Sequence, residues 1–199
     1  MRPRSPRRWT LAAAVALAGS LLVGCSSGDD AVVYGGTFNF VSPGGQTEIY
    51  YDPPAERGTV GGIAGPSLMQ PDETIALSDY AGEVVVLNVW GQWCAPCRTE
   101  MPQLQEVFDN TKDLGVQLIG INVRDRQISK PQDFVTSSDF TFPSIYDPPM
   151  RTLLALGGIP TSVVPMTVVL DREHRVAAVF LKDLLAEDLQ PVVERVAAE

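Results

Sequence analysis

Two cysteines separated by two residues are the part of this sequence best suited to chemistry. Cys94 and Cys97 lie in the run Trp90-Gly91-Gln92-Trp93-Cys94-Ala95-Pro96-Cys97. The segment before them, Val84–Trp90, is a continuous apolar run that predicts a strand buried on both faces. A helix is predicted from Ala95 onward. A C-x-x-C pair at such a strand-to-helix junction is typical of cysteines that exchange disulfides.

The position at a helix start gives the two cysteines different expected roles. A thiol there faces unpaired N–H groups and the positive end of the helix dipole, and both favour the nucleophilic thiolate. We therefore expect Cys94 to attack and Cys97, one turn into the helix, to resolve the mixed disulfide from within. Pro96 fits the first turn, where an N–H has no helical partner. Trp93 is expected to cover the pair and shape a docking surface.

A structural disulfide or half of a zinc site would use the same two cysteines. Zinc needs about four ligands, and with Cys25 modified, as argued below, only Cys94, Cys97 and the single His174 remain. His174 lies in a polar turn and is expected to be exposed to solvent. A bridge across two intervening residues would constrain the unfolded chain little. We favour a redox pair that uses no metal and no added cofactor.

The elements around the pair alternate between strand and helix. This pattern predicts an α/β domain in which helices flank a central mixed sheet. The segments Thr37–Val41 and Glu48–Tyr51 are β-prone and enclose a turn, so Thr37–Tyr51 is predicted as an N-terminal hairpin. Asp52–Pro66, rich in Pro and Gly, is predicted as a linker. The further predicted strands are Val116–Val123, Met166–Leu170 and Val176–Leu181, and the predicted helices are Ala95 to about Thr111, Pro131–Thr136, Met150–Leu156 and Leu184–Ala198.

The N-terminus has the pattern of an export signal. The basic Met1–Arg8 precedes the apolar run Trp9–Val23, which is short for a bilayer of about 30 Å. The run ends at Leu22-Val23-Gly24-Cys25, which resembles a bacterial lipobox and implies cleavage before Cys25 and lipidation of its thiol; an uncleaved anchor helix is the alternative. We expect a signal peptide over 1–24, a lipidated tether, hairpin and linker over 25–65, and the redox domain over 66–199.

The charge balance narrows the classes of partner. The chain has 15 Lys and Arg against 24 Asp and Glu, a formal net charge of −9. Nucleic-acid binding needs clustered basic side chains, so we expect no nucleic-acid partner. Both interpretations of the N-terminus place the body of the protein outside the cytoplasm.

Residues on both sides of the cysteine pair resemble the TlpA/ResA/CcmG group of membrane-tethered thioredoxin-like proteins. They are Val86–Cys97, Glu100-Met101-Pro102 and Val164–Asp171. The whole chain is most similar to the CcsX-type lipoproteins of actinobacteria. The resemblance implies a thioredoxin-like fold over residues 66–199. It also implies a role in cytochrome c maturation, with apocytochrome c or another thiol-containing exported protein as the partner and re-reduction by a CcdA-type membrane protein.

The resemblance assigns further site residues. Asn88 stands where ordinary thioredoxins have a buried aspartate, so that acid–base route is absent. Glu100 holds the position of the group's characteristic glutamate, which implies proton handling; an ordinary exposed helix acid is the equal alternative. Pro165 is expected to be the cis-proline that faces the cysteines, against the alternative of a trans strand-edge proline. Val164 precedes it and brings no hydroxyl to the site.

The direction of electron flow is a separate question. A reductase and an oxidant that forms disulfides in secreted proteins share this fold, and direction depends on potential and partner. Arg98 is the only cation close to the motif in sequence, while Glu100 opposes it, which favours a reductant. A non-enzymatic apocytochrome-binding chaperone is a third candidate. The Pro-x-x-x-Thr-x-x-Cys pattern of a peroxiredoxin is absent from the sequence.

Overall fold

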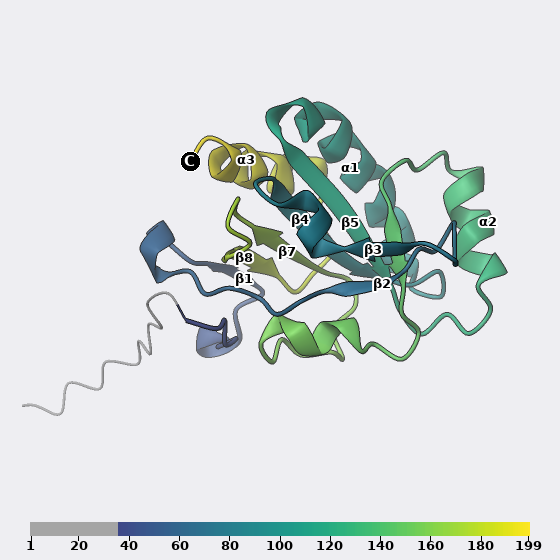
Figure 1. The fold of residues 1–199 in the computed structure, drawn as a ribbon, viewed down its shortest axis with the longest axis horizontal. Helices are drawn as coiled ribbons and strands as arrows, with labels where there is room; N and C mark the ends of the chain where they lie inside the picture. Colours follow the sequence, from purple (N-terminus) through teal and green to yellow (C-terminus); the bar gives the residue numbers. More distant parts are fainter. Residues whose placement is uncertain (1–35) are drawn as a thin grey trace, which may run out of the picture. The chain divides into compact units, whose positions relative to one another are not determined.

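A six-stranded mixed sheet forms the centre of the protein. The computed structural model describes residues 36–199, which belong to one compact unit (Figure 1). Strands β4 (Val84–Trp90), β5 (Val116–Asn122) and β6 (Ser144–Tyr146) are mutually parallel. Strands β7 (Met166–Leu170), β8 (Val176–Phe180) and β1 (Glu48–Tyr50) extend the sheet by antiparallel pairing, in the order β1-β8-β7-β4-β5-β6. The predicted mixed sheet is therefore confirmed.

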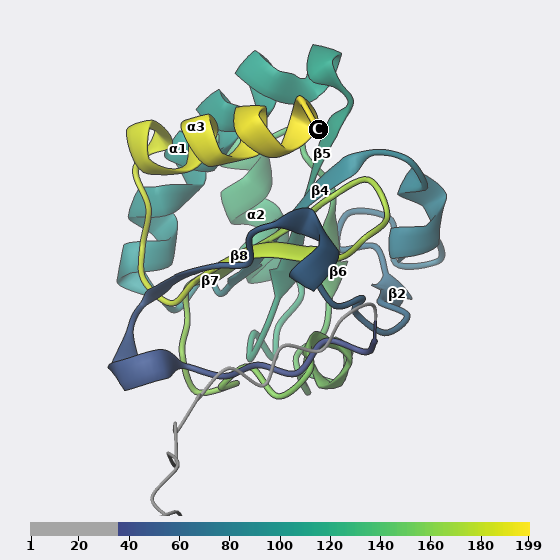
Figure 2. The ribbon, with the colours of Figure 1, turned by 90° about the vertical axis from the view of Figure 1, so that its left-hand side faces the viewer.

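Helices cover one face of the sheet. They are α1 (Ala95–Thr111), α2 (Ser129–Ser137) and α3 (Ala186–Ala197) (Figure 2). Successive residues of a strand point to opposite faces, so Val84 and Val86 of β4 pack with the helices while Val85, Leu87 and Val89 pack on the other side. The structure thus has two hydrophobic layers, and β4 belongs to both.

The opposite face is covered by the segment that precedes β4 and by a short 3-10 helix at Thr152–Leu156. That segment contributes Phe38 and Ile63 to the core and includes the small sheet of β2 (Ala64–Pro66) and β3 (Thr74–Ala76). Residues 36–65 are therefore part of the same compact unit as the redox domain, which the sequence prediction had started at residue 66. The remaining 3-10 helices are Pro43–Gly45, Pro54–Glu56, Leu77–Tyr80 and Lys112–Leu114.

The N-terminal hairpin expected over Thr37–Tyr51 is not formed. Strand β1 pairs instead with β8, where Ile49 is opposite Val179. The backbone N–H of Phe38 donates to Thr59 O at 2.8 Å, and that of Phe40 donates to Gly157 O at 2.7 Å. The apolar alternation identified β-prone segments correctly, but alternation carries no information about which strand a segment pairs with. Here the open edge of β8 supplies the partner.

Most of the other predicted elements are present in the structure, some with the predicted ends and some with shifted ends. The boundaries of β4 and β7 are those predicted, and α1 begins at Ala95 as expected. The short helix predicted over Met150–Leu156 is a 3-10 helix that begins at Thr152. Within residues 36–199, none of the helices combines the length and the hydrophobicity needed to cross a membrane. The predicted signal peptide and Cys25 lie outside the described residues.

A fully buried arginine joins the N-terminal segment to the C-terminal end. Arg57 is 0% exposed. Its Nε donates to Tyr51 O at 2.9 Å, and its guanidinium forms ion pairs with Asp52 at 2.8 Å, Asp171 at 3.2 Å and Glu199 at 2.5 Å. Buried charges need such partners because the loss of hydration is costly. Arg57 thereby holds together three segments that are distant in sequence.

We predict that Arg57→Met destabilises the folded protein by about 3–5 kcal/mol, because it leaves the buried Asp171 carboxylate with fewer cationic partners. Urea denaturation at neutral pH measures the loss. Lys112→Met is the matched control, since Lys112 forms its ion pair with Asp109 on the surface, and it should change stability little. Equal midpoints for the two variants would contradict the assignment.

Candidate active site: the Cys94–Cys97 pair

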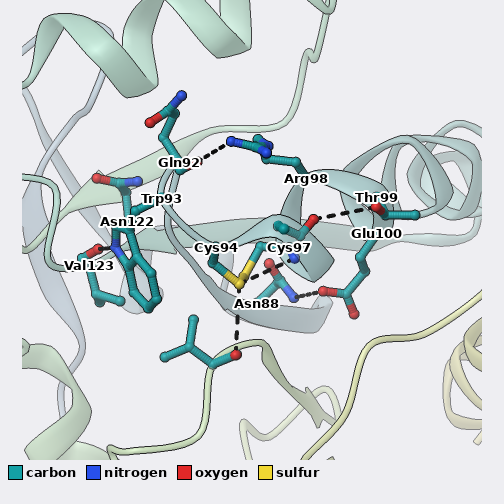
Figure 3. Close-up of a disulfide and its surroundings, with 12 residues drawn as sticks. Asn88, Gln92, Trp93, Cys94, Cys97, Arg98, Thr99, Glu100, Asn122 and Val123 are labelled. Atoms are coloured by element: carbon teal, nitrogen blue, oxygen red, sulfur yellow. Dashed lines mark hydrogen bonds between the residues drawn. A yellow bond between two sulfur atoms is a disulfide. The ribbon is translucent and has the colours of Figure 1, made fainter.

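The two cysteines form a disulfide at the N-terminus of α1. Cys94 is the N-cap residue, and its Sγ accepts a hydrogen bond from the backbone N–H of Cys97 at 3.3 Å (Figure 3). Pro96 lies in the first turn of α1, as predicted. Cys94 is 4% exposed and Cys97 is 0% exposed. Cys94 is thus the only cysteine of the pair with a path to solvent, although a narrow one.

Trp93 lies beside the disulfide and not over it. Its side chain is 45% exposed, and its Nε1–H donates to Val123 O at 2.9 Å, at the end of β5 (Figure 3). Gly91 permits this position, because a Cβ at Gly91 would lie 2.3 Å from Trp93 Nε1. The exposed indole is therefore held in a defined position next to Cys94.

Glu100 is buried beneath the pair, which decides between its two predicted environments. It is 2% exposed; its Oε2 accepts from Asn88 Nδ2 at 3.2 Å and its Oε1 accepts from Leu184 N at 3.1 Å. Asn88 Nδ2 also donates to Thr167 Oγ1 at 3.0 Å. Burial raises the pKa of Glu100 to about 8, although both hydrogen bonds act in the opposite direction. The residue can therefore hold or release a proton near neutral pH.

The segment before β7 closes the other side of the disulfide. The Val164–Pro165 peptide bond is cis, which confirms the expectation for Pro165. Val164 O lies 3.7 Å from Cys94 Sγ (Figure 3). Val164 turns its backbone carbonyl toward Cys94, while its side chain packs against the hydrophobic core.

The turn after β5 contacts the active-site loop and was not identified from the sequence. Asp125 accepts from Gln92 N at 2.7 Å and from Asn122 Nδ2 at 2.8 Å. The Arg124 guanidinium lies 5.7 Å from the centroid of the Trp93 ring. The sequence did contain a signal for this contact. The turn directly follows a strand parallel to β4, and parallel strands end at the same edge of a sheet.

The structure also describes the surroundings of His174 and the arrangement of possible metal ligands. His174, expected to be exposed, is half-buried, and its Nε2 lies 3.1 Å from Tyr80 O. Among residues 36–199, no three His, Cys, Asp or Glu side chains are arranged to hold a metal ion.

Comparisons with known proteins agree with this geometry. The thiol-disulfide oxidoreductase ResA of Geobacillus kaustophilus is 32% identical over 120 residues, which are 60% of this chain and 67% of that protein. A secreted thiol-disulfide isomerase from Corynebacterium glutamicum superposes with a TM-score of 0.80 at 48% identity, over 83% of this chain and 100% of that one. A DsbF homologue from Corynebacterium diphtheriae superposes with a TM-score of 0.76 at 52% identity, over 80% of this chain and 99% of that one.

The match to a protein family covers most of the sheet, without β1, and includes the redox pair. Residues 65–179 match the AhpC/TSA family, and this range includes Cys94, Cys97, Glu100 and the cis-proline. The relatives named above are thiol-disulfide oxidoreductases with the same fold. The chain therefore belongs to the AhpC/TSA family and is a thiol-disulfide oxidoreductase with a thioredoxin-like fold.

Proposed function

We propose that the protein is a reductase, tethered through a lipid on Cys25 to the outer face of the cell membrane, that keeps the haem-attachment cysteines of apocytochrome c reduced. One observation carries the direction: among residues 36–199, no Lys or Arg side chain donates a hydrogen bond to either sulfur. Arg98 donates through Nη1 to Gln92 O at 3.1 Å and points away from the pair (Figure 3). A thiolate that no cation contacts directly is stabilised mainly by the helix end, which favours a moderate or low potential.

Cys94 and Cys97 carry the reaction in this proposal. The Cys94 thiolate attacks one sulfur of the substrate disulfide, and a mixed disulfide forms as the other substrate sulfur leaves and takes a proton. Cys97 then loses its proton and attacks Cys94 Sγ, which releases the second substrate thiol. The substrate disulfide is reduced, and the protein dithiol becomes the disulfide seen here. Trp93, Val164 and Pro165 orient the substrate beside Cys94.

Glu100 supplies the proton relay for the second step. The carboxylate accepts the proton of Cys97 and returns it toward the departing thiolate, and Asn88 keeps the carboxylate in place. A general base works best when its pKa lies near the working pH, and a pKa of about 8 meets that condition. The cysteine pair needs no other cofactor, and a CcdA-type membrane protein restores the dithiol.

A second candidate is an exported oxidant or isomerase that forms or rearranges disulfides in secreted proteins. The observation in its favour is the similarity to the secreted isomerase of Corynebacterium glutamicum and to the DsbF homologue of Corynebacterium diphtheriae, at 48% and 52% identity. The two functions use the same site and differ in potential and partner.

We predict that Cys94 is the first cysteine to be alkylated in the reduced protein at mildly acidic pH. Cys94 is the helix N-cap and has the exposed edge, whereas Cys97 is fully buried. Mass spectrometry of peptides after brief treatment with iodoacetamide gives the order. Faster labelling of Cys97 would exchange the two roles.

We predict that Glu100→Gln removes a pH dependence of stability. The folded-state pKa of about 8 lies above the ordinary value of 4.5, so the folded protein binds the extra proton between these pH values. Its stability then falls as pH rises through this window, by at most about 1.4 kcal/mol per pH unit. Urea unfolding of the oxidised protein from pH 5 to 8.5 measures the slope. Glu106→Gln, exposed on the same helix, is the control and should keep the wild-type slope.

The equilibrium potential together with a deletion strain tests the direction. We expect a potential well below the strongly oxidising value of about −120 mV and loss of c-type cytochromes in the strain, restored by the wild-type gene. Mass spectrometry of the membrane fraction from the restored strain should show a diacylglyceryl group on Cys25. A strongly oxidising potential with cytochromes still made would favour the second candidate, and an unmodified Cys25 would contradict the tether.

A further inference from the structure

The basic residues of the structure divide into two groups by their partners. Arg57, Lys112, Arg175, Lys182 and Arg195 each have a carboxylate within 4.0 Å, whereas Arg172 has none but is half-buried and donates to three backbone carbonyls. A second group has no carboxylate within that distance among residues 36–199, and all its members are exposed. This group, which we call the cationic patch, consists of Arg98, Arg124, Arg126, Lys130 and Arg151.

The topology brings the cationic patch to the edge of the sheet that holds the disulfide. Arg98 follows β4, Arg124 and Arg126 follow β5, and Arg151 follows β6. These three strands are parallel neighbours, so their carboxyl ends meet at one edge. Cys94 lies at the same end of β4. The exposed cations that lack a carboxylate partner within residues 36–199 thus lie at the edge of the sheet that also holds Cys94.

Acidic side chains do not cancel the cationic patch at this edge. Asp125 and Asp147 lie in the same loops and are buried, and even when both are counted as negative they offset only two of the five positive charges of the patch. The exposed Asp183, Glu187 and Asp188 follow β8, which β7 separates from β4 on the opposite side of the disulfide. Asp133, one turn into α2, is the exposed acid nearest the patch in sequence. The edge is therefore cationic on the β5–β6 side and acidic on the β8 side.

Arg124 fixes the centre of the cationic patch. Its φ of 60° lies in the left-handed region, which residues with a side chain rarely adopt and which is often found at functional sites. The backbone N–H donates to Pro148 O at 3.2 Å and Nη2 donates to Thr161 O at 2.9 Å. The guanidinium also lies 5.7 Å from the centre of the exposed Trp93 ring. The charge is therefore held at the rim of the site by carbonyl groups that leave it unneutralised.

We propose that the cationic patch docks the protein substrate through an acidic segment that lies within a few residues of the substrate's disulfide. The inference rests on the proposed exchange with a protein disulfide and adds the chemistry of the partner. Complementary charge speeds encounter and selects the orientation in which two surfaces meet. With cations on the β5–β6 side and acids on the β8 side, the acidic segment lies over Arg124 and Arg126.

Two peptides with the same cysteine spacing test the proposal, one with glutamates and one with lysines beside the disulfide. At low ionic strength the reduced protein should reduce the glutamate peptide with a kcat/KM about tenfold higher. Raising the ionic strength to about 0.5 M should remove most of this preference. Equal kcat/KM values for the two peptides, or a preference unaffected by salt, would overturn the proposal.

Variants that reverse the charge of single residues test whether the cationic patch is the surface that binds the acidic segment. Arg126→Glu, at a position where the structure shows no side-chain hydrogen bond or ion pair within residues 36–199, should lower kcat/KM for the glutamate peptide about threefold to tenfold and raise it for the lysine peptide. Arg124→Glu should do so more strongly. Lys112→Glu changes the net charge equally at the far end of α1 and should leave the ratio unchanged; an equal effect of this control would place the steering in the overall charge and contradict the patch.

A small neutral disulfide, bis(2-hydroxyethyl) disulfide, separates this proposal from the proposed function. The Arg126→Glu and Lys112→Glu variants should reduce it at the wild-type rate, because it carries no charge to steer. If wild-type protein reduces neither the peptides nor this compound, the reductase proposal fails. If it reduces all of them without a charge preference, only the docking proposal fails.

Discussion

A polar side chain on strand β4 has no access to water, because all seven residues of the strand are buried. This constraint organises the active site. Asn88 is near the middle of β4 and 0% exposed, so its amide N–H groups can find partners only inside the protein, while its Oδ1 has no hydrogen-bond partner among residues 36–199. It donates to Glu100 on α1 and to Thr167 on β7. The helix that carries the cysteines and the strand that follows the cis-proline are thereby joined to β4 through one side chain.

The same arrangement gives Glu100 its unusual proton affinity. An exposed carboxyl at this position would ionise well below neutral pH. Beneath the disulfide it is cut off from water, and its hydrogen bonds to Asn88 and Leu184 offset only part of the burial cost. Structure and chemistry are coupled here, since a residue that helps to position α1 is also the buried carboxyl, three residues after Cys97, to which we assign the proton relay.

The sequence predicted the elements whose causes are local. A long apolar run defines β4, and Cys94 defines the start of α1. The burial of Glu100 also had a signal, since Cys97, Glu100, Met101 and Leu104 share one helical face. The sequence carries no such local signal for which strands pair with each other, and the prediction of a hairpin over residues 37–51 was wrong for this reason. The contacts of Arg57 could not be predicted, because its carboxylates come from residues 52, 171 and 199.

The positions and hydrogen-bond partners of the arginines near the redox pair bear on both its potential and its surroundings. A guanidinium in contact with Cys94 Sγ would stabilise the thiolate and raise the potential. Arg98 is held by Gln92 O and Arg124 by Thr161 O, so both charges stay near the site without reaching the sulfur. Backbone carbonyls accept these donors but do not neutralise them, unlike the carboxylates that surround Arg57. The arginine charges therefore remain accessible to the proposed acidic segment but do not contact the thiolate. Docking and reduction potential can then be set by different residues of the same edge.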